Sequence, residues 1–458
     1  MDERAQQLGE QKITRLLWQF SVPAIIGMLS NSLYMIINRL FVGNVVGADA
    51  ISGMSVTMPI SFVLMAFGML VGIGGGALIS IRLGQHKLEE AEHILGNALT
   101  LFFIIYVVIS AGLLLSLDFL LKSFGASPAI LPYGRQFISI ILWGSIFQFI
   151  SFGLGSTIRS EGNPRISMNI MLVNAGLNIL LDFIFVYILK LGMPGTAVAT
   201  IIAQAVSALM VIRHYLSPAS VLKLRLKNLR IKRHLVTGIF AIGMAPFSMQ
   251  LVASIINILF NQGLALYGGD NAIGAYGIIY TITMFILMPV LGINQGGQPI
   301  IGYNFGARNY ERVRETLKQS IIWATVILAA GYILAEVFAE SLMSAFSSNT
   351  ELIQIGAHGI RIFLIFLPVA GFQIVSANFF QAIGKALISM ILSMLRQVIV
   401  LIPLLLVLPR FLGLNGIWYA PAVADLISAL ITAGVLVYEL RKLGIVKSRE
   451  RIADNLLN

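Results

Sequence analysis

The sequence predicts an all-α integral membrane protein with twelve transmembrane helices in two pseudo-symmetric six-helix lobes. Of its 458 residues, 57% are hydrophobic and only 11% are charged, whereas soluble proteins carry roughly 25% charged residues. Apolar runs of about 20 residues, the length that crosses a bilayer as a helix, recur along the chain. The two halves of the chain also repeat one another. Together these observations exclude a soluble globular fold.

Twelve apolar segments are long enough to span a membrane as helices. Their apolar runs are continuous and exceed the roughly 9–11 residues of a barrel strand, which argues against an outer-membrane barrel. The first segment is longer than the ~7–15-residue core of a signal peptide, so we expect it to be retained. The predicted spans are 15–42, 51–80, 94–120, 136–158, 168–189, 193–215, 236–266, 272–302, 316–343, 354–381, 387–409 and 414–439.

The basic residues predict the direction of insertion. Placing the N-terminus in the cytoplasm puts all but seven of the 31 Lys and Arg residues on that side, the asymmetry that orients membrane proteins. We therefore expect both termini in the cytoplasm. The net charge of +11 is then a topology signal, and we expect the basic segment 223–233 to face anionic lipid rather than nucleic acid. The seven exceptions are Arg39, Lys122, Arg135, Lys190, Arg361, Arg396 and Arg410.

The halves of the chain match at an offset near 222 residues. Pro23 falls on Pro246 and Asn38 on Asn261, and apolar bias alone does not generate matching Pro and Asn positions. Because each copy has six helices, both insert with the same orientation, related by an axis along the membrane normal. The predicted organisation is an N-lobe at 1–215, a basic cytoplasmic linker at 216–235, a C-lobe at 236–440 and a cytoplasmic tail at 441–458.

Ionisable residues at membrane depth are scarce, and Asp182 is the main one. It falls in the middle of the fifth predicted span, where a carboxylate must be neutralised, hydrated or paired. Asn178 lies one turn earlier on the same helical face. Thr200 lies partway along the sixth span, which a short turn ties back against the fifth. We therefore expect an oxygen-rich patch in the N-lobe.

Three stretches resemble the multidrug and toxic compound extrusion (MATE) family, in its bacterial DinF-like/MepA-like branch. They are "LYMIINRLFVG" at 33–43, "RSEGNPRISMNIMLVNAGLNILLDFIF" at 159–185 and "GINQGGQPIIGYNFGARNY" at 292–310. The resemblance implies a secondary transporter of the bacterial cytoplasmic membrane that exports small cationic or amphipathic organic compounds by alternating access. It implies coupling by proton or sodium antiport, and no other cofactor.

The resemblance also assigns residues to a coupling site. In the family, an acid and an amide on helix five, a Thr on helix six and an Asp on helix one form the N-lobe cation or proton site. That implies Asp182, Asn178 and Thr200 here, with Tyr34 one turn below the helix-one position. The family motif on helix one is Asp-x-x-Phe-Val-Gly, whereas this chain has Asn38 in place of the Asp.

An amide at Asn38 cannot release a proton, which leaves three interpretations open. Asp182 alone couples, the chain is an engineered neutral variant, or this member has altered coupling. The side-chain oxygens of Asn38, Asn178, Asp182 and Thr200 could also ligate sodium, since hard cations prefer oxygen. The alternative for both Asn residues is interhelical hydrogen bonding.

Pro23 interrupts the first span and can kink it, because proline removes a backbone hydrogen bond. Bending of this helix accompanies protonation in the family. The resemblance therefore implies a helix-one kink at Pro23, although many membrane helices tolerate a proline without functional consequence.

The C-lobe offers polar residues without a comparable carboxylate. Candidates for a substrate cavity are the amides of helix seven, an aromatic and methionine stripe on helix eight, and one acid on helix twelve. Methionine side chains pack against varied shapes, and aromatic faces attract organic cations. A stripe of such residues on a helix nevertheless more often packs against lipid or the protein core. Arg396 could neutralise the acid in a structural ion pair. The candidates are Gln250, Asn257, Asn261, Tyr280, Met284, Met288 and Asp425.

Several classes of function are disfavoured. The chain has no Cys and five scattered His without an HExxH spacing, so no metal site is expected beyond sodium at the coupling site. Its glycine-rich stretches lack the P-loop Lys-Ser/Thr. A lipid-linked oligosaccharide flippase should have a more charged cleft, and an intramembrane lipid-modifying enzyme should have clustered acids or histidines. We expect no enzymatic activity, a monomer, and small organic substrates and membrane lipid as partners. For Glu161, a solvated loop role and a gating role remain open.

Overall fold

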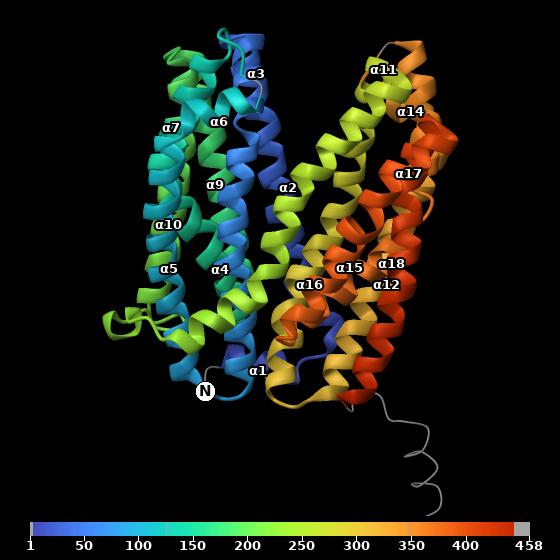
Figure 1. Ribbon diagram of the computed structural model, residues 1–458. Helices are drawn as coiled ribbons and strands as arrows, with labels where there is room; N and C mark the ends of the chain where they lie inside the picture. The colour runs from blue at the N-terminus through green and yellow to red at the C-terminus, as the bar shows by residue number, and fades with distance from the viewer. Residues whose placement is uncertain (1–2, 125, 348, 444–458) are drawn as a thin grey trace, which may run out of the picture. The chain divides into compact units, whose positions relative to one another are not determined.

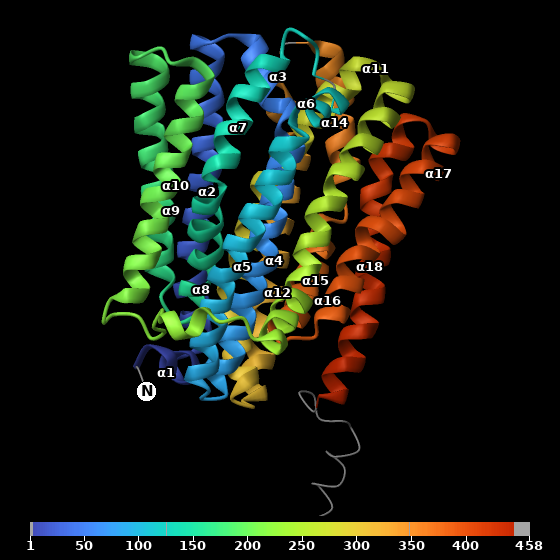
Figure 2. The same ribbon diagram turned by 60° about the vertical axis from the view of Figure 1, so that its left-hand side comes forward.

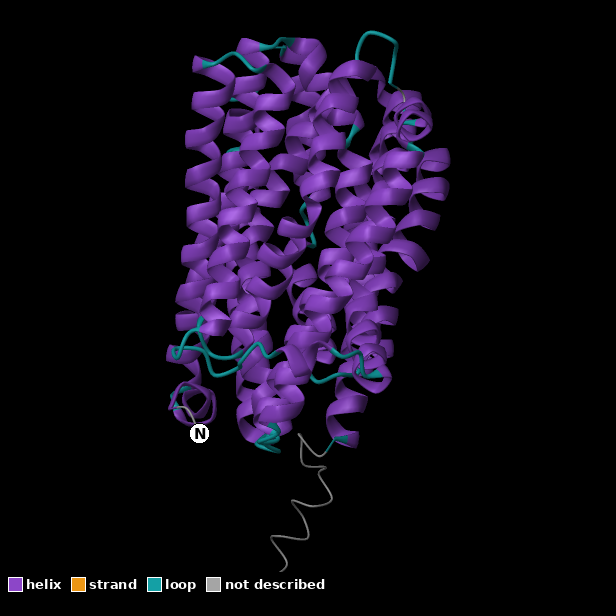
Figure 3. Ribbon diagram, turned by 90° about the vertical axis from the view of Figure 1, so that its left-hand side faces the viewer, coloured by secondary structure: helices purple, strands orange, loops and turns teal. Residues whose placement is uncertain are grey.

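The computed structural model describes residues 3–124, 126–347 and 349–443. Within these ranges the chain forms helices and their connecting loops, with no strand (Figure 3). The all-α class predicted from the sequence is confirmed. Most of the predicted cytoplasmic tail, 444–458, lies outside the described residues.

Eleven of the described helices are long and apolar enough to cross a membrane, and one bent helix pair brings the number to twelve. The pair, Thr350–Phe363 and Leu367–Ala382, bends by 52°, and its second helix has Pro368 in the first turn, where the missing N–H costs no hydrogen bond. Each predicted span overlaps one observed span. Besides the bent pair, the observed spans are Ile13–Val45, Met58–Gly84, Leu88–Leu115, Leu131–Ser160, Pro164–Ile188, Gly192–Leu216, Arg233–Gly269, Asn271–Gly306, Tyr310–Val337, Ala386–Leu412 and Leu414–Lys442.

The helices follow one another with short connections. Up to the linker they are α1 (Glu3–Glu10), α2 (Ile13–Val45), α3 (Ala48–Val56), α4 (Met58–Gly84), α5 (Leu88–Leu115), α6 (Leu117–Ser123), α7 (Leu131–Gln148), the π-helical turn η1 (Phe149–Leu154), α8 (Gly155–Ser160), α9 (Pro164–Asp182), the π-helical turn η2 (Phe183–Ile188), α10 (Gly192–Leu216) and the 3₁₀ turn η3 (Leu226–Leu229).

The second half begins with α11 (Arg233–Gly306), which holds two spans separated at Gly269. Gly269 has a φ of 65°, which glycine adopts without steric cost. The remaining elements are α12 (Tyr310–Val337), α13 (Ala339–Ser344), α14 (Thr350–Phe363), α15 (Leu367–Ala382), α16 (Ala386–Met394), the π-helical turn η4 (Leu395–Leu401), α17 (Ile402–Leu412) and α18 (Leu414–Lys442).

The chain forms two compact units. Unit 1 holds the residues up to Glu10 and Val22–Gln250, and unit 2 holds Gln11–Ser21 and the residues from Leu251 onward. In unit 1, α4 lies beside α5, and α10 lies beside α7 and α9 (Figure 1). In unit 2, α15 packs against both α12 and α18 (Figure 2).

These units differ from the predicted lobes at helices one and seven. The first part of α2 belongs to unit 2, where Trp18 meets Trp323 edge to face with ring centroids 5.0 Å apart. The first part of α11 belongs to unit 1, where Phe247 meets Phe67, also at 5.0 Å. The two ends of a long helix can pack against different neighbours. The predicted boundary lies between helices, whereas the observed division between the units falls within α2 and within α11.

Glycines allow the close packing of the exchanged helix segments. A Cβ on Gly74 would stand 2.2 Å from the carbonyl oxygen of Ile239 in α11. In unit 2, a Cβ on Gly296 would stand 2.6 Å from the hydroxyl oxygen of Ser21 in α2. Only glycine permits such backbone approach. The stretches "GIGGG" and "GINQGG" therefore serve helix packing.

The linker between α10 and α11 is bound along α5, which it crosses in Figure 2. The Asn97 amide donates to the carbonyl oxygens of Asn228 (3.3 Å) and Arg230 (3.1 Å) and accepts from the Lys232 N–H (2.8 Å). The Thr100 hydroxyl donates to the Leu229 carbonyl at 2.8 Å. The basic linker is thus a strap, by which we mean a segment held against α5 of unit 1 by hydrogen bonds to its backbone.

Replacing Asn97 with Ala is expected to loosen this strap. The change leaves buried backbone groups of the linker without partners, at about 1–3 kcal/mol each, and local opening exposes the chain to proteases. Trypsin should then cut the linker at least about tenfold faster in the detergent-purified protein, giving two large fragments on a gel. Asn44→Ala, which removes an exposed amide on α2, should leave the rate unchanged. Equal rates for all three proteins would show that Asn97 does not secure the linker.

Candidate functional site

Asp182 lies at the end of α9, fully buried, with 0% of its surface exposed. Neither carboxylate oxygen has a hydrogen-bond partner among the described residues. One turn earlier, the buried Asn178 donates from Nδ2 to the Thr200 hydroxyl at 3.1 Å. The Asn178 Oδ1 atom is also buried without a partner among the described residues. Unit 1 therefore holds three oxygens with unused acceptor capacity on one face of α9.

Hydrogen bonds connect α2, α9 and α10 at this point. Thr196 on α10 donates its hydroxyl to the side-chain oxygen of Asn38 on α2 at 2.8 Å. The Thr200 hydroxyl, which accepts from Asn178, donates to the Thr196 carbonyl at 2.9 Å. Asn38, Asn178 and Thr200 are thus joined into one network with Thr196. Sequence reasoning missed Thr196, although its position one turn before Thr200 on α10 was a signal for it.

The Thr196 hydroxyl, which donates to Asn38, also lies near the Asp182 carboxyl group, and Tyr34 lies near this group as well. Tyr34 is one turn before Asn38 on α2. The predicted residues Tyr34, Asn38, Asn178, Asp182 and Thr200 therefore occupy one region of unit 1.

The backbone changes directly after Asp182. The π-helical turn η2 begins at Phe183, and the Leu189 N–H donates to the carbonyl of Ile184, five residues earlier, at 2.9 Å. Such turns occur frequently at functional sites. Phe183 also packs on Phe41 of α2, with ring centroids 6.2 Å apart. The turn thus follows the carboxylate and contacts the helix that carries Asn38.

The donor set allows a limited chemistry. A buried carboxylate with no donor is unfavourable as a bare anion, so a proton or a cation is needed to neutralise Asp182. Every ligand atom offered nearby is an oxygen, which suits a hard cation such as sodium. Among the described residues no group of three or more His, Cys, Asp or Glu could hold a metal ion.

Pro23 lies within α2, which continues as one helix from Ile13 to Val45. The division between the two compact units falls between Ser21 and Val22, directly before this proline. The predicted role of Pro23 in bending helix one stays a prediction.

The C-lobe candidates are divided between the two units. Gln250 belongs to unit 1, whereas the other candidates belong to unit 2. Asn257 donates to the Ala253 carbonyl of its own helix at 2.9 Å, and Asn261 is exposed. Tyr280 is 39% exposed and lies beside Tyr276, with ring centroids 6.1 Å apart.

The other helix-eight candidates, Met284 and Met288, are partly buried. Asp425 is buried and paired with Arg396. The arginine therefore neutralises this acid, as the sequence suggested.

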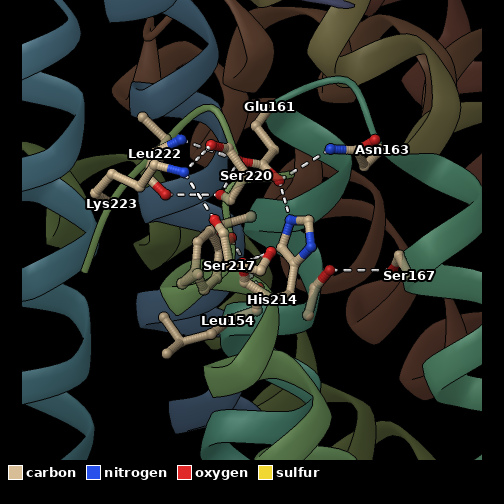
Figure 4. A network of polar contacts seen from close by, with 12 residues as sticks. Leu154, Glu161, Asn163, Ser167, His214, Ser217, Ser220, Leu222 and Lys223 are labelled. Atoms are coloured by element: carbon tan, nitrogen blue, oxygen red, sulfur yellow. Dashed lines mark hydrogen bonds and ion pairs between the residues drawn. The ribbon is translucent and has the colours of Figure 1, made fainter.

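A second polar network lies at the end of α8, around Glu161 (Figure 4). Glu161 is fully buried. Its Oε1 atom pairs with His214 Nε2 and accepts from Asn163 at 3.1 Å. Its Oε2 atom accepts from the Ser220 hydroxyl at 2.7 Å and the Leu222 N–H at 3.2 Å. The solvated loop role considered for Glu161 is wrong, because the linker folds over this carboxylate and encloses it.

The family comparison matches most of the chain. The MatE family model matches twice, at residues 23–184 and 246–407. The two matches have equal length and an offset of 223 residues, as the internal repeat predicts.

Curated relatives of similar length are multidrug exporters. The chain is 30% identical over 440 residues to "Multidrug export protein MepA" of Staphylococcus haemolyticus, covering 96% of both chains. It is 28% identical over 446 residues to the protein of that name from Staphylococcus aureus strain MSSA476, covering 96% of this chain and 97% of the relative.

Solved structures share the fold over 96% of the chain. The MATE multidrug transporter DinF-BH, solved as a complex with a ligand, is 37% identical with a TM-score of 0.88, covering 96% of this chain and 99% of that one. A MATE transporter of the MOP superfamily in an outward-facing conformation has a TM-score of 0.90 at 23% identity, covering 96% and 98%. This chain belongs to the MATE family, a family of membrane transporters rather than enzymes.

Proposed function

We propose that this transporter exports small cationic or amphipathic organic compounds by alternating access, in exchange for protons or sodium ions. The names of its relatives support multidrug export. The observation that carries the coupling proposal is the buried Asp182 carboxylate, which has no hydrogen-bond partner among the described residues. We further propose a monomer in the bacterial cytoplasmic membrane, with both termini in the cytoplasm.

The coupling ion acts by neutralising Asp182. A proton on the carboxylate, or a sodium ion held by Asp182, Asn178 and Thr200, removes the cost of a bare buried charge. An ion that binds one arrangement of the transporter more tightly shifts the population toward that arrangement. Substrate that prefers the other arrangement then drives the opposite step, which yields antiport.

A lipid-linked oligosaccharide flippase is the rival function within the superfamily. It would have to recognise phosphates and sugars with several charged and polar groups. The N-lobe network supports a flippase less well than a multidrug exporter, since Asp182 is the single carboxylate of this network.

Purified protein in liposomes separates the two candidate ions. We expect a fluorescent organic cation to accumulate inside the vesicles when the lumen is acidic, or when it is loaded with sodium, and not without a gradient. Accumulation under only one gradient identifies the ion. Equal, slow entry under every condition would overturn antiport, and movement of a labelled lipid-linked sugar alone would favour the flippase.

Restoring the family carboxylate by Asn38→Asp tests how Asn38 contributes. The new carboxylate can still accept the Thr196 hydroxyl, so the fold is retained, and the site gains a second proton-binding group beside Asp182. We expect the number of protons exchanged per substrate to rise from one to two, measured from the gradient that just stops net transport. Asn44→Asp adds an exposed acid six residues along α2 and should change nothing. An unchanged ratio in both variants would place Asn38 outside the coupling site.

A further inference from the structure

Unit 2 contains an ion pair deep within its membrane spans. Arg396 donates from Nε to Oδ1 of Asp425. Arg396 lies on η4 in the span Ala386–Leu412, and Asp425 lies on α18 in the span Leu414–Lys442. At about 1.5 Å per residue, each lies roughly 15 Å from the start of its span. Charged residues at such depth are rare and usually functional.

The two members of the pair differ in exposure. The Asp425 side chain is 4% exposed and the Arg396 side chain 24%. The carboxylate is therefore covered, and the guanidinium is the charged group on the surface of the unit. Its terminal nitrogens make no hydrogen bond to any of the residues that the structure describes. A planar fork of unused N–H donors matches the two oxygens of a carboxylate.

The exposed guanidinium must meet water or a ligand rather than lipid, because an arginine facing hydrocarbon at this depth costs several kcal/mol. The phosphate of a lipid headgroup lies at the membrane surface and does not reach the middle of the span. The group that fits the fork is therefore an anionic group on a small molecule.

The internal repeat shows that the helix scaffold does not require the pair. Matching "RISM" to "LISM" places Asn174 at the position of Arg396, and matching "QAVSAL" to "DLISAL" places Gln204 at that of Asp425. Both amides keep a buried side-chain oxygen without a hydrogen-bond partner among the described residues. Unit 1 thus has two amides where unit 2 has an ion pair, so the repeated sequence pattern does not require the pair.

The backbone at Arg396 is also modified. The π-helical turn η4 runs from Leu395 to Leu401, and such insertions occur frequently at functional sites. The neighbouring Gln397 has a buried side-chain oxygen without a partner among the described residues. Arg396 therefore lies in a segment that departs from α-helical geometry and contains a side-chain oxygen free to accept a hydrogen bond.

We propose that Arg396 binds the carboxylate of transported compounds, with Asp425 holding the guanidinium in position. Unit 2 then selects compounds that carry an anionic group besides their cationic or apolar part, which extends the proposed function from organic cations to zwitterions. This step rests on the proposed export of small organic compounds.

Two forms of one dye test this assignment directly. A cationic rhodamine ethyl ester and the corresponding free acid, a zwitterion, differ by one negative charge. Binding of each dye is measured by fluorescence anisotropy with the full-length transporter in phosphatidylcholine nanodiscs, without any gradient. In the double variant Arg396→Gln/Asp425→Asn, we expect the affinity for the acid to fall by roughly tenfold or more, and the affinity for the ester to stay within about twofold.

The double variant removes both charges, so it leaves no unpaired charge buried. Arg361→Gln, which removes an arginine of unit 2 paired with Glu336 at 3.8 Å, is the matched control. If acid and ester lose affinity by the same factor, or neither does, the pair is structural and the proposal is overturned. Should the double variant not fold, Arg396→Lys keeps the charge but loses the fork. It must then weaken the acid selectively, and unchanged binding would overturn the proposal.

The binding measurement is independent of coupling. Absence of gradient-driven transport in the unaltered protein would overturn the proposed function while leaving selective binding of the acid intact. Loss of selectivity with normal transport of the ester would overturn only the role of Arg396.

Discussion

Replacing Asp182 with Asn is expected to reduce gradient-driven transport of an organic cation by about 100-fold or more. The amide has nearly the same shape as the carboxyl group but can neither take up a proton nor carry the charge that holds a cation. The transporter then lacks the group through which ion binding favours one of its two arrangements over the other. Transport into liposomes with an acidic or sodium-loaded lumen measures the effect.

The same variant should be as stable as the unaltered protein or more so. Neither carboxylate oxygen of Asp182 accepts a hydrogen bond from a described residue, so the substitution breaks no such bond and removes a costly buried charge. Thermal unfolding in detergent tests this expectation.

Asp118→Asn is the control for Asp182→Asn. It removes a half-exposed carboxylate paired with Arg135 at 3.3 Å and should leave transport and stability unchanged. Normal transport by Asp182→Asn under both gradients would refute the coupling site. A large loss of stability would mean that Asp182 serves the fold.

Replacing Glu161 with Ala is expected to release the linker from unit 1. The buried carboxylate accepts from Ser220 and from the Leu222 N–H within the linker, and from His214 at the end of α10. Losing one side of a buried charged network costs about 3–5 kcal/mol, because the remaining donors lose their partners. We expect a clearly lower unfolding temperature and much faster trypsin cleavage within the linker.

Two further substitutions sharpen this prediction. Glu161→Gln keeps one acceptor oxygen and should have a smaller effect than Glu161→Ala. Glu340→Ala removes an exposed acid of α13 and should behave like the unaltered protein. If Glu161→Ala resists heat and trypsin as well as Glu340→Ala, the network around Glu161 does not hold the linker.

Much of the fold could be predicted because the bilayer sets the length of a spanning helix. Each of the twelve predicted apolar segments overlaps a span in the structure, once the bent pair Thr350–Phe363 and Leu367–Ala382 counts as one. The repeat was equally readable, since proline and asparagine recur at fixed positions. The sequence did not show that the two ends of helices one and seven pack in different units, because hydropathy carries no information about packing partners.

Part of the N-lobe network could also be predicted. Asn178 and Asp182 share a face by helical spacing, and the short turn after helix five brings Thr200 to them. The bond from Thr196 to Asn38 joins residues 158 positions apart in the chain, and nothing in the local sequence indicates it. The packing of α2 against α10 decides that contact.

The sequence by itself determined the membrane spans, their duplication and the prominence of Asp182, because hydropathy and the scarcity of charge are local properties of the chain. Only the tertiary structure decided which groups are paired. It buried Glu161 under the linker, covered Asp425 with Arg396 and left the Asp182 carboxylate without a donor among the described residues. Hydrogen bonding and burial depend on distances between helices that are far apart in sequence, and those distances are set by packing.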